Sequence, residues 1–459
     1  MRQGLARLAG GASTWSLAAL LLILPFWGHW VLFGQPIDPV LYDYHEIVLY
    51  ATDLFLWAAL GGWLLSRLLH PSRPKLQWGP TLLLAPQIGL LALGVIGVPQ
   101  AVDPVYAAYG VVRLALMLAF YLMLVNAPVK RDLIVWPLAA GIAVQGAVGV
   151  PQFLLGHSLG LKWLGETAID AGTPGASVVM VGEGRWLRAY GLTQHPNVLG
   201  GLLMASFWVV IGHLLTQRGW RRIALLSLVA VGWGTLLVTF SRAVWLGTAV
   251  GGVVLAGLLL FWPGAAGRPE RPVSRSAVTL LAGVLVAVLL VFVLANWQLL
   301  RPRLGLVSQG VEIRSLDERV ELNKAALTLI GLRPWLGVGV SNFSEALLRL
   351  TPVSVSRYRD YSPVHNVLLL TTAELGLLGG LMWLVLLISP WLALWLRRRH
   401  LQMTPWWAGL NAALAALMVV SFLDHYLWSF QQGRLIFWLV YGLWAREWTA
   451  HTGIEEVEP

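Results

Sequence analysis

Two arginines and a histidine occur where long apolar runs begin or end. Arg188 lies in RAYGLTQHPNVLGG, Arg242 in TFSRAVWLG, and His365 in SPVHNVLLLTTAELGLLGG. A guanidinium group is permanently charged, and its planar fork matches phosphate oxygens. Histidine exchanges a proton near neutral pH. If the chain brings these residues together, they predict a base beside an anion-binding site. The alternative, that the histidine is a structural cap at a helix start, stays open.

The elements that must position these residues are expected to be membrane-spanning helices. Of the 459 residues, 57% are hydrophobic and 12% are charged, about half the charged share of a soluble protein. Apolar runs of the roughly 20 residues that a spanning helix needs recur along the chain. We therefore expect an all-α polytopic membrane protein whose first span is not cleaved. The expected spans are 14–34, 47–69, 80–98, 107–127, 132–156, 197–216, 222–240, 242–263, 276–300, 363–396, 405–424 and 433–446.

Basic residues alternate between the connections that join these spans. Each expected inside connection is short and basic, whereas the outside connections 35–46 and 99–106 contain no Lys or Arg. This pattern predicts that both termini are cytoplasmic. The net charge of +10 then reflects membrane orientation rather than nucleic-acid binding. The absence of cysteine excludes disulfides, thiolate metal sites and cysteine nucleophiles.

Two outer loops break the alternation, because 157–196 and 301–362 together carry twelve cations. Such a surplus indicates an anionic ligand, either a phospholipid headgroup or a lipid-linked phosphate. A basic loop that merely touches anionic lipid is the simpler alternative. We predict three parts: spans 1–9 within 1–300, a periplasmic loop domain at 301–362, and spans 10–12 with a cytoplasmic tail at 363–459. Within the loop domain, Ile313 to Ile330 has the spacing of an amphipathic helix, with an apolar face that includes Val320 and Leu327.

Two charges lie inside expected spans, where an unpaired charge is costly. Asp53 and Arg113 fall at similar depths in spans 2 and 4. We predict that they form a structural ion pair. Direct contact with a substrate is the alternative.

A reaction that would use the outer histidine and arginines is glycosyl transfer from a lipid diphosphate. A base takes the proton of the acceptor hydroxyl, and cations stabilise the departing diphosphate. The sequence has no D-x-D pattern, so the usual aspartate route to a divalent ion is not visible. We expect a transfer that needs no metal or other cofactor. Direct displacement with inversion is favoured, because no outer carboxylate stands out as a nucleophile.

Four blocks of the sequence resemble the O-antigen ligase and polymerase superfamily. They are RAYGLTQHPNVLGG, TFSRAVWLG, DERVELNKAALTLIGLRPWLGVGVSNF and HNVLLLTTAELGLLGG, in that order between about 185 and 385. The flanking spans match only as hydrophobic segments. The resemblance implies a glycosyltransferase-C-like fold of about 12 transmembrane helices with one helical periplasmic domain.

The resemblance also implies roles for particular residues. His365 would be the base, and Arg188, Arg242 and Arg319 would bind the diphosphate. Arg314 could replace Arg319 if the loop alignment shifts. His195 suggests a helix-start role, and Glu374 more an orienting role than a catalytic one; both remain possible supporting residues.

The implied activity is transfer of glycan from undecaprenyl diphosphate to the sugar of the lipid A core. It would take place at the periplasmic side of a Gram-negative inner membrane, in contact with membrane lipid. A polymerase or a protein O-oligosaccharyltransferase with the same donor is the alternative. An anion transporter is disfavoured, because its polar groups would gather at mid-membrane. The compact late loop and the block pattern favour the ligase.

Overall fold

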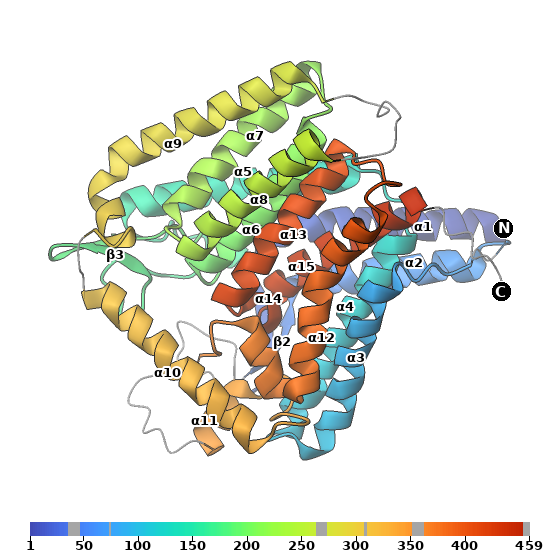
Figure 1. Ribbon diagram of the computed structural model, residues 1–459, viewed down its shortest axis with the longest axis horizontal. Helices are drawn as coiled ribbons and strands as arrows, with labels where there is room; N and C mark the ends of the chain where they lie inside the picture. The colour runs from blue at the N-terminus through green and yellow to red at the C-terminus, as the bar shows by residue number, and fades with distance from the viewer. Residues whose placement is uncertain (35–45, 73–74, 263–272, 307–309, 351–361, 453–459) are drawn as a thin grey trace.

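The computed structural model describes residues 1–34, 46–72, 75–262, 273–306, 310–350 and 362–452, the side chains of 310–316 excepted (Figure 1). Over these residues the chain is almost entirely helical, with two short hairpins. The all-α prediction is therefore confirmed. Helices lie at all twelve predicted spans: α1 (Arg2–Ile23), α2 (Ala51–Leu69), α3 (Thr81–Gly97), α4 (Pro104–Asn126), α5 (Asp132–Leu155), α6 (Pro196–Leu214), α7 (Gly219–Val238), α8 (Arg242–Phe261), α9 (Arg275–Arg303), α12 (Val367–Arg397), α13 (Pro405–Leu423) and α15 (Gln431–Thr452).

Ten of these twelve helices are long and apolar enough to cross a membrane. The other two, α2 and α15, carry polar side chains that are buried in the core. The remaining elements are η2 (Val98–Gln100), η3 (Lys162–Leu164), α10 (Gly310–Leu332), α11 (Phe343–Leu350), α14 (Tyr426–Ser429), and the strands β1 (His29–Gly34), β2 (Glu46–Tyr50), β3 (Val178–Val181) and β4 (Gly184–Leu187).

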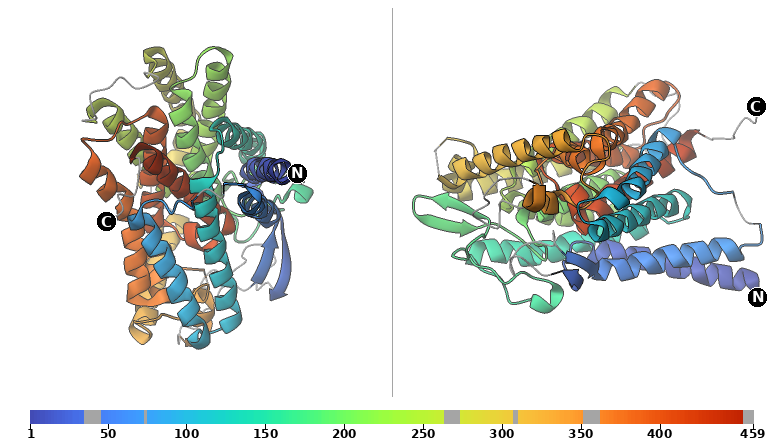
Figure 2. Two further views of the ribbon diagram at one scale, coloured as in Figure 1. Left: turned by 90° about the vertical axis from the view of Figure 1, so that its right-hand side faces the viewer. Right: turned by 90° about the horizontal axis from the view of Figure 1, so that it is seen from below.

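The first predicted span, 14–34, is wrong at its second half. Helix α1 ends at Ile23, and the apolar stretch after Pro25 continues as strand β1, which pairs antiparallel with β2. Proline has no N–H to continue a helix, and the aromatic and β-branched residues that follow suit a strand. A long apolar run therefore concealed a change of secondary structure. Helices α1 and α2, which flank this hairpin, lie side by side (Figure 2).

The centre of the bundle is formed by α6 and α13, which pack against each other and are buried along most of their lengths. Helix α9 lies at the edge of the bundle (Figure 1) and exposes most of its apolar side chains. Exposed leucine and valine at the edge suit contact with lipid tails. Because α6 and α13 are packed on most sides, the residues at their ends are held in fixed positions.

The connections gather at two ends of the bundle. At one end, Trp262 Nε1 donates to the Leu401 carbonyl (2.9 Å), and the Arg446 guanidinium to that of Val129 (2.8 Å). At the other, Arg303 donates to the Val178 carbonyl (3.3 Å). We call this second end, with residues 157–196 and the α7–α8 turn, the site end.

The buried ion pair between α2 and α4 is confirmed. Arg113 Nη1 lies 2.6 Å from Asp53 Oδ1, and both side chains are almost fully buried. Asp53 also accepts from Gln431 Nε2 (2.9 Å) and from the Tyr50 backbone N–H (2.9 Å). The pair therefore joins α2, α4 and α15, and its role is structural.

Removal of one partner of this pair should destabilise the protein strongly. Asp53→Ala leaves a buried guanidinium without its carboxylate, a change that costs about 3–5 kcal/mol. Thermal unfolding of the purified protein in detergent measures the loss. Glu321→Ala, which removes an exposed partner of Lys324, should leave the melting temperature nearly unchanged. Equal melting temperatures for the two variants would contradict the structural role.

The predicted amphipathic helix within 313–330 is confirmed as part of α10, but the predicted apolar face is partly wrong. The buried face consists of Leu322, Ala326 and Leu329, whereas Val320 and Leu327 are exposed. The buried three recur at spacings of four and three and pack beside α12. Contact with α12 therefore determines which face of α10 is buried.

The glycine-rich segment after α10 inserts into a break in α12. Gly376 has φ +75° inside α12, and Gly337 has φ +67°. Backbone hydrogen bonds join the two segments, from Leu377 to Pro334 and from Val338 to Ala373 (2.8 and 2.9 Å). A Cβ at Gly337 or Gly376 would lie under 2.5 Å from the opposing backbone. Only glycine allows this approach, which fastens the end of α10 to α12.

Candidate functional site

Three polar side chains meet where two helices are interrupted at the site end. His365 lies just before α12, whose first turn is capped by the Asn366 side chain (3.1 Å to the Leu369 N–H). Asp424 and His425 form the link between α13 and α14, where Asp424 has an extended backbone and His425 is the N-cap of α14. One nitrogen or carboxylate oxygen from each of the three lies within 4.8 Å of the others. We call these three residues the His–Asp cluster.

The two imidazoles of the cluster are in contact edge to face. Their ring centroids are 5.0 Å apart at an interplanar angle of 81°. His425 Nδ1 shares a hydrogen bond with Ser429 Oγ (2.6 Å). Among the described residues, His365 Nδ1 is buried without a hydrogen-bond partner. His365 therefore has a ring nitrogen that no described residue satisfies.

A short chain of hydrogen bonds connects Asp424 to Arg188. Asn197 Nδ2 donates to Asp424 Oδ2 (2.7 Å), and Arg188 Nη2 donates to Asn197 Oδ1 (2.6 Å). Asn197 lies in the first turn of α6, so the buried centre of the bundle holds this bridge. The predicted cation Arg188 is thereby brought to the His–Asp cluster.

Arg188 also contacts the turn that carries Arg242. Its Nε donates to the carbonyl of Thr239 (2.6 Å). In that turn, Phe240 adopts φ +49° and buries its ring, and Arg242 begins α8 as an exposed residue. The two predicted cations therefore belong to one contact region, with Arg188 buried and Arg242 open to solvent.

Arg319 reaches the cluster from α10. Its Nη1 donates to the carbonyl of Leu423 (2.9 Å), the residue before Asp424. The alternative, Arg314, belongs to the same helix, but its side chain lies outside the described residues. Arg188 and Arg319 thus approach Asp424 from different elements.

The two supporting residues have structural partners. His195 is the N-cap of α6, where Nδ1 accepts from the Asn197 N–H (3.1 Å), which confirms the helix-start interpretation. Its Nε2 hydrogen-bonds to Ser177 Oγ (2.8 Å). Glu374 is buried beside the break in α12 and accepts from Trp428 Nε1 (2.8 Å). Glu374 is not a member of the His–Asp cluster, and its orienting role stays a prediction.

The electrostatics of the cluster separate a neutral base from a charged carboxylate. Burial, reinforced by the Arg319 charge, lowers the pKa of His365 to about 4, although Asp424 opposes this shift. Burial would raise the pKa of Asp424, but the two cluster histidines and Arg319 lower it to about 2. Burial lowers the pKa of His425 to about 3. At neutral pH the cluster therefore contains two neutral imidazoles and a carboxylate.

Two histidines and an aspartate could also hold a divalent metal ion. Three neighbours of Asp424 disfavour this use. Asp424 is already engaged by Asn197 and by the His425 backbone N–H (2.8 Å), and the Arg319 cation lies beside it. A positive charge beside the ligands opposes cation binding, so the arrangement suits an anion better.

Sequence reasoning missed Asp424, His425 and Asn197. The signal for the first two was an Asp-His pair directly after the apolar run 405–423, in a connection without Lys or Arg. The signal for Asn197 was its place in the first turn after TQHP. None of these short segments shows that it faces His365, which is distant in sequence.

Residues 226–384 match a family model described as O-antigen ligase. The matched segment includes Arg242, Arg319 and His365 but not Arg188 or the Asp424–His425 pair. No curated protein matches the chain. This segment of the chain is therefore similar to the O-antigen ligases.

Proposed function

From the similarity of residues 226–384 to O-antigen ligases, we propose that the protein is an O-antigen ligase. It transfers O-antigen glycan from undecaprenyl diphosphate to a sugar of the lipid A core. The observation that supports this most is the unpartnered Nδ1 of His365, a neutral imidazole beside Asp424, with Arg188 and Arg319 fixed around the same carboxylate. The site end then faces the periplasm of a Gram-negative bacterium, and both termini are cytoplasmic.

In the proposed reaction His365 accepts the proton of an acceptor hydroxyl. The hydroxyl oxygen attacks the anomeric carbon as the bond from that carbon to the diphosphate oxygen breaks. The proton remains on His365, the electron pair leaves with undecaprenyl diphosphate, and the anomeric configuration inverts. The ionised Asp424 stabilises the imidazolium that forms, in the manner of a carboxylate that orients a catalytic histidine.

The leaving diphosphate gains negative charge as the glycosidic bond breaks. Arg188, Arg242 and Arg319 would donate to its oxygens, and fixed donors of this kind stabilise a transition state without reorganisation. Arg188 is held by two hydrogen bonds and Arg319 by one. These cations supply the charge that a divalent ion supplies in other diphosphate enzymes.

A chelator should therefore leave the transfer rate unchanged. We expect equal rates for enzyme dialysed against EDTA and for enzyme supplied with Mg²⁺, Mn²⁺ or Zn²⁺. Transfer that stops in EDTA and returns with one of these ions would instead assign the His–Asp cluster to a metal.

The superfamily match fits a polymerase or a protein O-oligosaccharyltransferase as well, because these share the donor. The purified protein is incubated with undecaprenyl-diphosphate glycan, alone, with lipid A core, or with an acceptor protein. Product only with the core supports the ligase. Longer lipid-linked chains without any acceptor indicate a polymerase, and a glycosylated protein indicates the oligosaccharyltransferase.

A further inference from the structure

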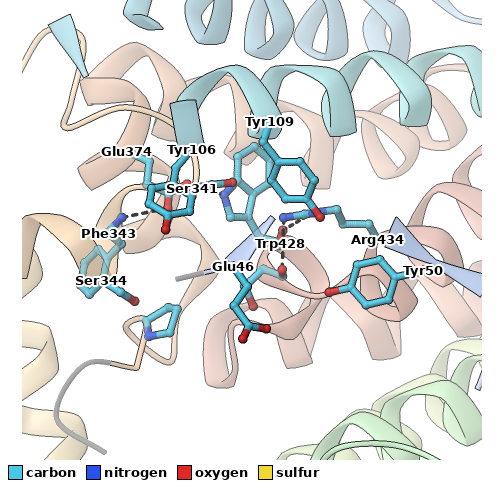
Figure 3. A pocket seen from close by; sticks show the side chains of 12 residues that line it. Glu46, Tyr50, Tyr106, Tyr109, Ser341, Phe343, Ser344, Glu374, Trp428 and Arg434 are labelled. Carbon is cyan, nitrogen blue, oxygen red and sulfur yellow. Dashed lines mark hydrogen bonds between the residues drawn. The ribbon is translucent and has the colours of Figure 1, made fainter. Parts of the chain in front are cut away.

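A pocket lies at the site end, next to the His–Asp cluster. The space between its walls, open solvent at the mouth included, is about 550 Å³, and its enclosed part is small. Figure 3 shows side chains from α4, β2, α12 and the 341–344 segment around it. It is lined by Glu46, Tyr50, Tyr106, Tyr109, Ser341, Phe343, Ser344, Pro363, Glu374, Trp428, Ser429 and Arg434. We call it the tyrosine pocket.

The tyrosine pocket shares a wall with the cluster. Ser429, which lines it, hydrogen-bonds to His425, and the His425 ring contacts that of His365. Pro363 lines it too, two residues before His365. Arg188, Arg242 and Arg319 are not among the lining residues. A molecule in this pocket would therefore approach the proposed base from a place that the diphosphate arginines do not line.

The charges that line the pocket do not suit a diphosphate. It contains two carboxylates, Glu46 and Glu374, and one guanidinium, that of Arg434. Arg434 donates to the backbone carbonyls of Trp428 and Ser429, so part of its donor capacity serves the fold. The Glu374 oxygens accept from the Phe343 N–H and from Trp428 Nε1, so Glu46 is the carboxylate that would accept from ligand hydroxyl groups and repel phosphate. The occupant should be uncharged and rich in hydroxyls.

The aromatic side chains point to the same class of ligand. Tyr106 and Tyr109 project from α4 on one side of the pocket, with Tyr50 and Glu46 across from them (Figure 3). Aromatic faces pack against the C–H face of a sugar ring, and phenol hydroxyls hydrogen-bond to its edge. A pyranose has an apolar face and a polar edge, so a pocket that combines aromatic rings with a carboxylate suits it.

We propose that the tyrosine pocket binds the acceptor, through an uncharged sugar whose hydroxyl is presented to His365. This inference rests on the proposed glycosyl transfer and adds a location to it. The donor diphosphate lies by the arginines and the acceptor sugar lies among the tyrosines. His365 is linked to the pocket through His425 and Ser429, and its neighbour Asp424 is linked to Arg188 through Asn197. In a ligase the sugar is that of the lipid A core; in a polymerase it would be that of a second lipid-linked glycan.

The test separates acceptor from donor in transfer kinetics. For Tyr106→Ala and Glu46→Gln we expect the acceptor KM to rise about tenfold and the donor KM to stay unchanged. Trp163→Ala, which removes an exposed aromatic ring outside the pocket, should change neither. An unchanged acceptor KM in both pocket variants overturns the proposal. A rise in the donor KM alone also overturns it, because the pocket would then hold the donor glycan.

A binding measurement without donor tests the tyrosine pocket separately from the transfer reaction. Lipid A core in detergent is titrated into His365→Ala enzyme and into the double variant His365→Ala/Tyr106→Ala. Binding to the first and its loss in the second supports the pocket even if the wild-type enzyme transfers nothing to that core. Equal binding to both overturns the pocket and leaves the proposed function intact.

Discussion

His365→Ala should transfer glycan about 10²–10⁴-fold more slowly than the wild-type enzyme, the usual contribution of a general base. The variant removes the only cluster nitrogen among the described residues that is buried without a hydrogen-bond partner. Since no native hydrogen bond to Nδ1 is lost, the fold should survive the change. Initial rates at saturating donor and acceptor measure the effect on kcat.

A matched control separates the base from a general loss of histidine. His400→Ala removes an exposed histidine after α12, at the opposite end of that helix from His365, and should retain full activity. Donor binding should persist in His365→Ala, because the arginines are untouched. Wild-type kcat in His365→Ala would remove it as the base, whatever the binding result.

The pH profile provides a second measurement on the same residue. A group whose pKa is lowered to about 4 is neutral above that value and loses its basic lone pair only below it. The transfer rate should therefore stay level from pH 8 to about pH 5 and fall near pH 4. A fall centred near pH 6.5 would indicate an imidazole with its ordinary pKa.

Arg242→Ala should lower kcat/KM for the donor about 10²–10³-fold, the cost of removing one fixed donor from a developing anion. Arg242 is exposed at the first position of α8, so its loss should leave the melting temperature unchanged. Arg242→Lys should recover part of the activity, because lysine supplies the charge but not the planar fork.

The control for this variant lies at the other end of the bundle. Arg218→Ala removes an exposed arginine before α7, which is expected to be cytoplasmic, and should retain the wild-type rate. Binding of undecaprenyl diphosphate to each variant gives the second readout. Unchanged affinity and rate in Arg242→Ala would exclude its contact with the diphosphate.

The helices were predictable because length and apolarity are local properties of the sequence. The Asp53–Arg113 pair was predictable too, since two charges at similar depths in apolar helices have few alternatives to each other. The end of α1 was not, because apolar composition continues unchanged from helix into strand β1. Length alone does not distinguish the two.

The site was predictable to the extent that unusual residues marked it. His365, Arg188 and Arg319 stood out against apolar or loop surroundings, and the structure gathers them around Asp424. Asp424 itself did not stand out, because its partner Asn197 is brought to it only by the packing of α6 on α13. Likewise, the buried face of α10 depends on the position of α12, and the spacing of apolar residues in α10 does not reveal that position.

Because α10 is fastened to the break in α12, the number of residues in α10 determines where Arg319 lies. The C-terminal end of α10 is fixed by the backbone hydrogen bonds around Gly337. Arg319 must also lie on the side of α10 that faces the Leu423 carbonyl, to which it donates. One residue inserted or deleted between them would rotate Arg319 by about 100° around the helix axis. Homologous chains should accordingly tolerate substitutions on the exposed side of this helix while keeping the number of residues from Arg319 to Gly337 constant.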